Sequence, residues 1–291
     1  MRDIRRFFNT PPSVPLYHYT GIGSVLGIVQ NECVYASHAY YLNDSQELLY
    51  GCGQLRTIAN GYLESLDGSY REFVQQLILW LDSFKSPHCL FIFSLSEEQN
   101  LLSQWRSYTK HGKGVGLAFN PQRVISILST GKDLKIAKCL YEPEEQKELM
   151  SSLLDLCLVS FRQKAATIDT SKEHADQKYF GLLEGFREEF LQVMAIVKHG
   201  AFSEEREWRI ISPHFANFTV PEIKFREGAA VLVPYIEVDL PRDMRDQTLF
   251  DATVLGPSKH PNLAMSALAM FMSNNKASNM TINSNTPYRE W

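Results

Sequence analysis

The chain has 291 residues, 44% of them hydrophobic and 21% charged, which is ordinary for a soluble globular protein. Its formal net charge is −4, so it lacks the overall basic field that drives nucleic-acid affinity. This length can bury one large core or two small ones. We predict a single α/β (α+β) domain over residues 1–291, with a mixed sheet at its centre.

Cysteine use and hydropathy narrow the class of protein further. The five cysteines are odd in number and show no Cys-x-x-Cys or Cys/His ligand spacing, which favours buried, reduced thiols over disulfides or a metal site. The N-terminus carries charges but no apolar core of the signal-peptide type. No apolar stretch approaches the ~20 residues of a membrane span. We therefore expect a cytoplasmic protein that uses neither a metal nor a membrane.

The first predicted element is a strand over residues 16–20. Side chains alternate between the faces of a strand, so Tyr17 and Tyr19 share one face and His18 and Thr20 share the other. A lone histidine in a strand is more often a core residue than a functional one. The position of His18 near the strand end, beside Thr20, favours a functional role, in which both side chains hydrogen-bond ribose hydroxyls.

A helical stripe over residues 25–29 separates this strand from a second one at 34–37. Tyr35 in the second strand and Tyr40 after it could sandwich a flat ring such as nicotinamide, with Trp105 as a third aromatic wall. Ordinary packing of these aromatic side chains is the alternative.

The next elements follow from capping and breaking residues. Asp44 and Glu47 have capping-box spacing, which predicts that Asp44 is the N-cap of a helical block over residues 44–84. The Asn-Pro pair at 120–121 predicts a break before the next helix. Short strands are predicted on both sides of this break, at 89–94, 114–119 and 134–140, with a helical turn at 102–108 and a helix at 123–128.

Residues 143–198 are charged and have helical periodicity, so we interpret them as a helical insertion or subdomain. The final third is rich in predicted strands. These lie at 206–211, 230–239, 252–255 and 280–284, with one helix at 262–273.

The strand at 206–211 carries the second polar motif, and we predict that the central sheet brings it beside the strand at 16–20. Glu205, Glu207 and Arg209 alternate along it and are predicted to share one face. Two carboxylates on one face repel each other and need a cation or a hydrogen-bond donor nearby. One interpretation is an edge strand with a solvated charged face, in which Arg209 is the partner. The other is a carboxylate pair facing a cleft, in which Glu207 stabilises positive charge on a sugar and Glu205 positions the acceptor.

Taken together, these motifs resemble those of a bacterial family of uncharacterised proteins, and the resemblance spans almost the whole chain. The shared segments lie at residues 16–20, 42–44 with Glu47, 93–94, Trp105 with Tyr108, 114–116 with Phe119, Glu205 to Arg209, 256–257 and 287–289. Tyr17-His18-x-Thr20 also resembles the Tyr-His-Gly-Thr element of diphtheria-toxin-type ADP-ribosyltransferases and the His-x-Thr element of the DarT type. Tyr19 stands where the toxins carry glycine.

This resemblance implies an ADP-ribosyltransferase-like mixed sheet with helical insertions and NAD as the substrate. It implies an anti-phage or toxin role, with a nucleic-acid or protein acceptor and an antitoxin protein as a further partner. The catalytic residues would be Glu207 and Glu205. The NAD-binding residues would be His18, Tyr19, Thr20, Tyr35, Ser37, Tyr40, Trp105 and Arg209.

Two other functions stay open at this point. An NAD glycohydrolase would use the same site with water as the acceptor. A non-catalytic nucleotide-binding module would keep the fold without turnover, although the joint presence of His18, Glu205 and Glu207 argues against a degenerate site. Among acceptors, the His-x-Thr element favours RNA or DNA over protein.

Overall fold

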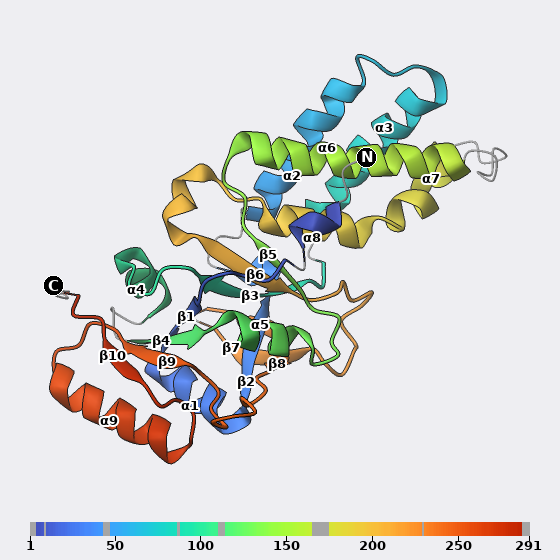
Figure 1. The fold of residues 1–291 in the computed structure, drawn as a ribbon. Helices are drawn as coiled ribbons and strands as arrows, with labels where there is room; N and C mark the ends of the chain where they lie inside the picture. Colours follow the sequence, from blue (N-terminus) through green and yellow to red (C-terminus); the bar gives the residue numbers. More distant parts are fainter. Residues whose placement is uncertain are drawn as a thin grey trace.

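The computed structural model describes residues 4–8, 10–42, 47–85, 88–109, 114–164, 175–228 and 230–286. Within these residues, ten strands form one mixed sheet, and a helical layer lies to one side of it (Figure 1). The predicted mixed α/β class is confirmed. Predictions that involve Asp44 and residues 287–289 lie outside the described residues.

The strands agree closely with the sequence-based elements, with one addition. The short strand β7 was not predicted, because all four of its residues are exposed and they show no apolar alternation. The ten strands are β1 (Leu16–Gly21), β2 (Cys33–His38), β3 (Phe91–Ser96), β4 (Gly114–Phe119), β5 (Lys135–Lys138), β6 (Glu207–Ile211), β7 (Lys224–Glu227), β8 (Leu232–Asp239), β9 (Ala252–Leu255) and β10 (Thr281–Asn283).

The predicted break at residues 120–121 is the start of a helix. The Asn120 side chain accepts a hydrogen bond from the Arg123 amide, and Pro121 occupies the first turn, where its missing amide hydrogen costs nothing. The α-helices are α1 (Ile22–Asn31), α2 (Glu47–Tyr62), α3 (Gly68–Trp80), α4 (Leu102–Tyr108), α5 (Pro121–Leu128), α6 (Pro143–Lys164), α7 (Ala175–Glu184), α8 (Arg187–Ile196) and α9 (Pro261–Asn274). Short 3-10 helices are η1 (Ile4–Phe7), η2 (Ala39–Tyr41), η3 (Leu81–Lys85) and η6 (Gly200–Glu205).

Strand β3 is the branch point of the sheet. One of its edges pairs with β6 along five residues, from Ile92 to Ser96. The other edge is shared: β1 pairs with it only at Ser96, and β2 pairs with it only at Phe91 and Ile92. The sheet therefore divides into two wings, β1-β4-β9-β10 and β2-β8-β7, and residues 93–95 pair with neither wing.

This topology corrects one expectation from the sequence. We expected the strand at 16–20 to lie beside the strand at 206–211, but β3 lies between them. Neighbouring strands lie about 4.8 Å apart, so the backbones of β1 and β6 are about 10 Å apart where both flank β3. This separation is wide enough for a small molecule or sugar to lie over β3, between the side chains of β1 and β6.

Two hydrophobic cores lie on opposite faces of the sheet. One packs β3 side chains such as Phe91 and Phe93 against α1 and α5, and the other packs Ile92 and Ile211 against the helical layer. The helical layer combines two distant segments of chain, because α8 contacts α2 and α7 contacts α3. The predicted helical insertion at 143–198 therefore packs together with the earlier helical block.

Candidate functional site

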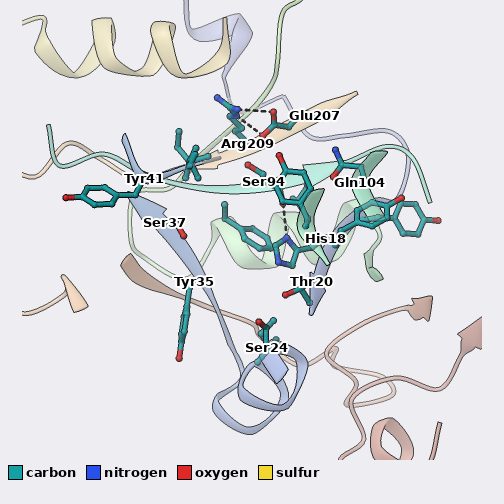
Figure 2. Close-up of a pocket in the computed structure, with 18 of the residues that line it drawn as sticks. His18, Thr20, Ser24, Tyr35, Ser37, Tyr41, Ser94, Gln104, Glu207 and Arg209 are labelled. Atoms are coloured by element: carbon teal, nitrogen blue, oxygen red, sulfur yellow. Dashed lines mark hydrogen bonds and ion pairs between the residues drawn. The ribbon is translucent and has the colours of Figure 1, made fainter. Parts of the chain in front are cut away.

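The gap between the two wings contains a cavity of about 530 Å³. This volume is within the range of small-molecule and cofactor sites. Side chains from β1, β2, β3, β6, β7, α1 and α4 line it. Figure 2 shows Ser94 of β3 between His18 on one side and Glu207 with Arg209 on the other. The branching of the sheet at β3 thus brings the two polar motifs, far apart in the sequence, to one cavity.

His18 is held in place by residues 93–94 of β3, which pair with neither wing. Its Nδ1 lies 3.0 Å from the carbonyl oxygen of Ser94, and its ring packs on Phe93 with the centroids 4.6 Å apart. A carbonyl can only accept, so Nδ1 carries the proton and donates. Burial lowers the pKa of His18 to about 4, against the opposing effect of the Ser94 hydrogen bond. At neutral pH the ring is therefore uncharged, and Nε2 can accept a hydrogen bond from a ligand hydroxyl.

The lowered pKa predicts acid sensitivity. Between pH 6.5 and about 4, His18 binds a proton in the unfolded chain but not in the folded one, so the free energy of unfolding falls as the pH falls through this window. We expect His18→Gln to flatten the pH dependence of urea denaturation there, because glutamine cannot titrate. His260→Gln, at an exposed position, is the control. An unchanged slope in His18→Gln would contradict the assignment.

Tyr19 has a structural role in the described fold. Its side chain is buried on the opposite side of β1 from His18 and meets the Trp105 ring edge-on. Its hydroxyl donates to the Glu98 carbonyl at 2.5 Å and accepts from the Leu101 amide at 3.1 Å. Tyr19 therefore fixes the loop that leads from β3 into α4, a contact that a glycine could not make.

Removing this hydroxyl should cost stability. In Tyr19→Phe the Leu101 amide loses its partner, and an unsatisfied buried donor costs about 1–3 kcal/mol. Urea denaturation measures this loss as a lower free energy of unfolding. Tyr70→Phe is the matched control, because the Tyr70 hydroxyl makes no hydrogen bond with the described residues. Equal effects of the two substitutions would show that the Tyr19 hydroxyl is unimportant.

The predicted aromatic walls are only partly correct. Tyr35 lines the cavity and stacks on Tyr235, with ring centroids 4.0 Å apart. Trp105 is fully buried behind Tyr19 and does not line the cavity. Tyr40 points into the helical core, where its hydroxyl donates to the Phe84 carbonyl at 2.6 Å. Tyr40 and Trp105 are therefore packing residues, as the alternative interpretation held.

Two polar side chains complete the rim on this side. Ser37 of β2 accepts a hydrogen bond from the Arg226 guanidinium of β7 at 3.1 Å, and both line the cavity. Arg226 is exposed, so its remaining donors can reach a ligand in the cavity. Thr20 also lines the cavity, on the His18 side.

The carboxylate motif forms a buried ion cluster. Arg209 donates to Glu207 through Nε at 2.8 Å and through Nη2 at 2.9 Å, which is the bidentate geometry of strong Arg–carboxylate pairs. Lys198 Nζ lies 2.8 Å from Glu207 and 2.6 Å from Glu205. The Glu207 side chain is thus the centre of a four-residue network of two anions and two cations.

This network keeps Glu207 ionised. Burial, with only 4% of the residue exposed, would raise the pKa of Glu207, but the charges and hydrogen bonds of Arg209 and Lys198 outweigh it and lower the pKa to about 2. Oε1 accepts only the Arg209 Nε hydrogen bond from the described residues, so it keeps capacity for one more donor. Glu207 can therefore receive a ligand hydroxyl as a preformed anion.

Glu205 reaches the cluster by a different route from the predicted one. It ends η6 rather than starting the strand, and Arg206 has a left-handed backbone with φ of 42°. The strand alternation we predicted therefore holds for Glu207 and Arg209 but not for Glu205. The Ser96 hydroxyl donates to the Glu205 carbonyl at 2.6 Å, and this contact anchors the turn that delivers the carboxylate.

The solvated-edge interpretation of this strand is wrong. Strand β6 pairs with β3 on one side and with β5 on the other, and all five of its residues are buried. Charged side chains in such a strand need partners. One partner that the sequence pattern did not reveal is Lys198, which is only 2% exposed. It follows the end of α8, next to the point where Val197 forms a bridge with Leu140.

Further residues at the site were not assigned a role from the sequence. The Tyr141 hydroxyl accepts a hydrogen bond from the Glu207 amide at 2.9 Å and so positions the start of β6. Gln104 and Tyr108 of α4 line the cavity. Burial, together with the nearby carboxylates of Glu205 and Glu207, raises the pKa of Tyr108. Its hydroxyl therefore stays protonated.

The described residues contain no group of three or more His, Cys, Asp or Glu side chains arranged to hold a metal ion. No helix among them has the length and apolar character needed to cross a membrane. The five cysteines are all buried, and none of them forms a disulfide in the described residues.

Comparison with known proteins adds one match. A family model described as a protein of unknown function (DUF2971) matches residues 104–210. This segment includes α4 from Gln104 onward and the whole ion cluster, but not β1 or β2. No curated protein and no solved structure gives a significant match.

Proposed function

We propose that the protein is an NAD-dependent ADP-ribosyltransferase. One observation carries this proposal: a single cavity contains a neutral His18, oriented by the Ser94 carbonyl, and an ionised Glu207, held by Arg209 and Lys198. Transfer of ADP-ribose requires a group that orients the ribose and a carboxylate that stabilises positive charge on it.

In the proposed reaction, the bond between nicotinamide nitrogen and ribose C1′ breaks, and nicotinamide leaves with the bonding electrons. The ribose develops oxocarbenium character, as in glycoside cleavage. A nucleophile on the acceptor then bonds to C1′, and its proton passes to a carboxylate or to water. We assign the role of positioning the acceptor to Glu205. It lies at the end of η6, and its carboxylate reaches the ion cluster through Lys198.

Glu207 would act through its remaining acceptor capacity. A ribose hydroxyl that donates to Oε1 would place the anion beside the developing charge. The Arg209 and Lys198 contacts fix the carboxylate before the substrate arrives, so little reorganisation is needed during the reaction. On the opposite side of β3, His18 Nε2 would accept from another ribose hydroxyl.

The rest of the dinucleotide would lie toward the β2 wing. Arg226 offers guanidinium donors at the rim, and guanidinium groups bind phosphate oxygens in bidentate fashion. Tyr35 presents an aromatic surface in the same region. For the acceptor we favour RNA or DNA over protein, on the resemblance of the His-x-Thr element alone.

A labelled-NAD assay tests the proposed function. Purified protein is incubated with NAD labelled in its adenylate part, with and without RNA, DNA and cell lysate. Label on a macromolecule is the expected result and identifies the acceptor class. Free ADP-ribose without macromolecular label would indicate a glycohydrolase instead, and saturable binding without nicotinamide release would indicate a nucleotide-binding module.

The substitution Glu205→Gln distinguishes the role of Glu205 from that of Glu207. If Glu205 serves the acceptor, the substitution should lower transfer by roughly 10²-fold or more, on the scale of positioned acid–base groups, while NAD hydrolysis changes less. The ratio of labelled acceptor to free ADP-ribose measures the difference. Equal losses in both reactions would assign Glu205 to NAD binding or to the fold.

A further inference from the structure

Helix α9 is an unusual surface element. It runs along the outside of the β9-β10 end of the sheet, far from the helical layer (Figure 1). None of its 14 residues is charged. It attaches to the sheet through Met272, which is buried, and through the partly buried Leu268 and Phe271. The opposite side of the helix is open to solvent.

The exposed side of α9 is a continuous stripe. Leu263 is 71% exposed and Met270 is 67% exposed. Ala267 lies between them and Asn274 follows, so the spacing is four, three and four residues. Residues at this spacing lie along one helix face and form the seam by which helices pair. Large, well-exposed apolar side chains on such a seam are typical of a contact surface.

The charge pattern selects the occupant. In a two-fold contact, residues near the axis meet their own copies, so a charged residue there would meet a like charge. A face without charges avoids this repulsion, whereas a face recognised by an oppositely charged partner would carry charges of its own.

The shape of the face is also self-complementary. A shallow hollow beside the C-terminal half of α9 is lined by Met270, Ser273 and Asn274, among others. Leu263 projects from the N-terminal half. Both lie about five residues, or ~8 Å, from the middle of the helix. A two-fold axis through that middle would therefore place Leu263 of each copy at the hollow of the other.

We propose that the exposed face of α9 is a homodimer interface, in which two copies of this helix pack antiparallel. The proposal is independent of the proposed activity. One pair of ~21 Å helices is a small contact, at the low end of specific interfaces. We therefore expect a dissociation constant in the micromolar range rather than a permanent dimer.

Analytical ultracentrifugation over about 2–200 µM, a range chosen around micromolar affinity, tests this on the full chain. The expected result is a shift from 33.3 kDa toward twice that mass as concentration rises. Met270→Glu should weaken the dimer by roughly tenfold or more, since a buried unpaired charge is costly. Leu79→Glu is the matched control, because Leu79 is exposed on α3, away from α9.

Two further variants make the test specific. An equimolar mixture of Ala267→Glu and Ala267→Lys should dimerise better than either variant alone, because residue 267 lies near the two-fold axis and opposite charges then meet. Ala267→Cys should give a cross-linked dimer with a short bis-maleimide, and Ser65→Cys should not. The native cysteines do not interfere with this test, because they are all buried. A mass of one chain up to 200 µM, or a dimer that Met270→Glu does not weaken, would overturn the proposal.

Discussion

Glu207→Gln is expected to lower NAD-dependent turnover by roughly 10²-fold or more, the scale found when one preorganised electrostatic group is removed. The substitution keeps the shape of the side chain and removes the charge. In the native site the pKa of Glu207 lies near 2, so the carboxylate is fully ionised at neutral pH. Its interaction with the substrate grows as positive charge develops on the ribose, which is the condition for catalysis. Release of nicotinamide under single-turnover conditions measures the effect.

The same substitution also tests the fold, so stability must be measured beside activity. Glutamine leaves Arg209 and Lys198 buried next to a neutral amide, and removal of one partner from a buried ion pair costs up to about 3–5 kcal/mol. Activity is therefore compared at a temperature at which circular dichroism shows both proteins folded. Glu97→Gln is the control, because Glu97 is also ion-paired, to Lys138, but does not line the cavity. A folded Glu207→Gln protein with full turnover would remove the main support for the proposed function.

Lys198→Met should be the most destabilising single change in the site, with a loss of about 3–5 kcal/mol in the free energy of unfolding. Lys198 contacts Glu205 at 2.6 Å and Glu207 at 2.8 Å. Without its charge, two carboxylates share a buried site in which Arg209 alone contacts Glu207. Lys198→Arg retains the charge and is expected to lose less. Urea denaturation of the three proteins at pH 7.5 gives the comparison.

The pH dependence distinguishes lost charge from lost packing. In Lys198→Met the repelling carboxylates have higher pKa values in the folded state than in the native protein. A raised folded-state pKa means that stability is lost as the pH rises and recovered as the pH falls through that pKa. The difference in the free energy of unfolding between Lys198→Met and the native protein should therefore become smaller as the pH falls from 7.5 to 5. A deficit that stays constant over this range would indicate lost packing alone.

Local sequence patterns predicted most elements of the sheet because each pattern reports on its own segment. The strand at 114–119 coincides with β4, and the predicted strand at 252–255 coincides with β9. Strand β7 was missed because it is exposed along its whole length and is held only by pairing with β8. Its residues carry no apolar alternation, which is the signal that sequence periodicity detects.

The candidate site was predictable in its motifs but not in its contacts. His18, Glu207 and Arg209 were identified because polar residues in predicted strands need an explanation. Tyr40 and Trp105 were misplaced because nothing in an aromatic side chain's sequence position shows whether it faces a cavity or a core. Lys198 carried no signal at all, since a single lysine after a helix is usually solvated.

By itself, therefore, the sequence determined which strands carry chemistry-bearing side chains and which segments are helical, because side-chain periodicity within one element depends only on local order. The tertiary structure decided what those side chains meet. The branching of the sheet at β3 opened the cavity and brought His18 and Glu207 to it, and the Leu140–Val197 bridge placed Lys198 between the carboxylates. Which strands become neighbours is set by packing across the whole molecule, as the pairing of β3 with β6, a strand far along the chain, illustrates.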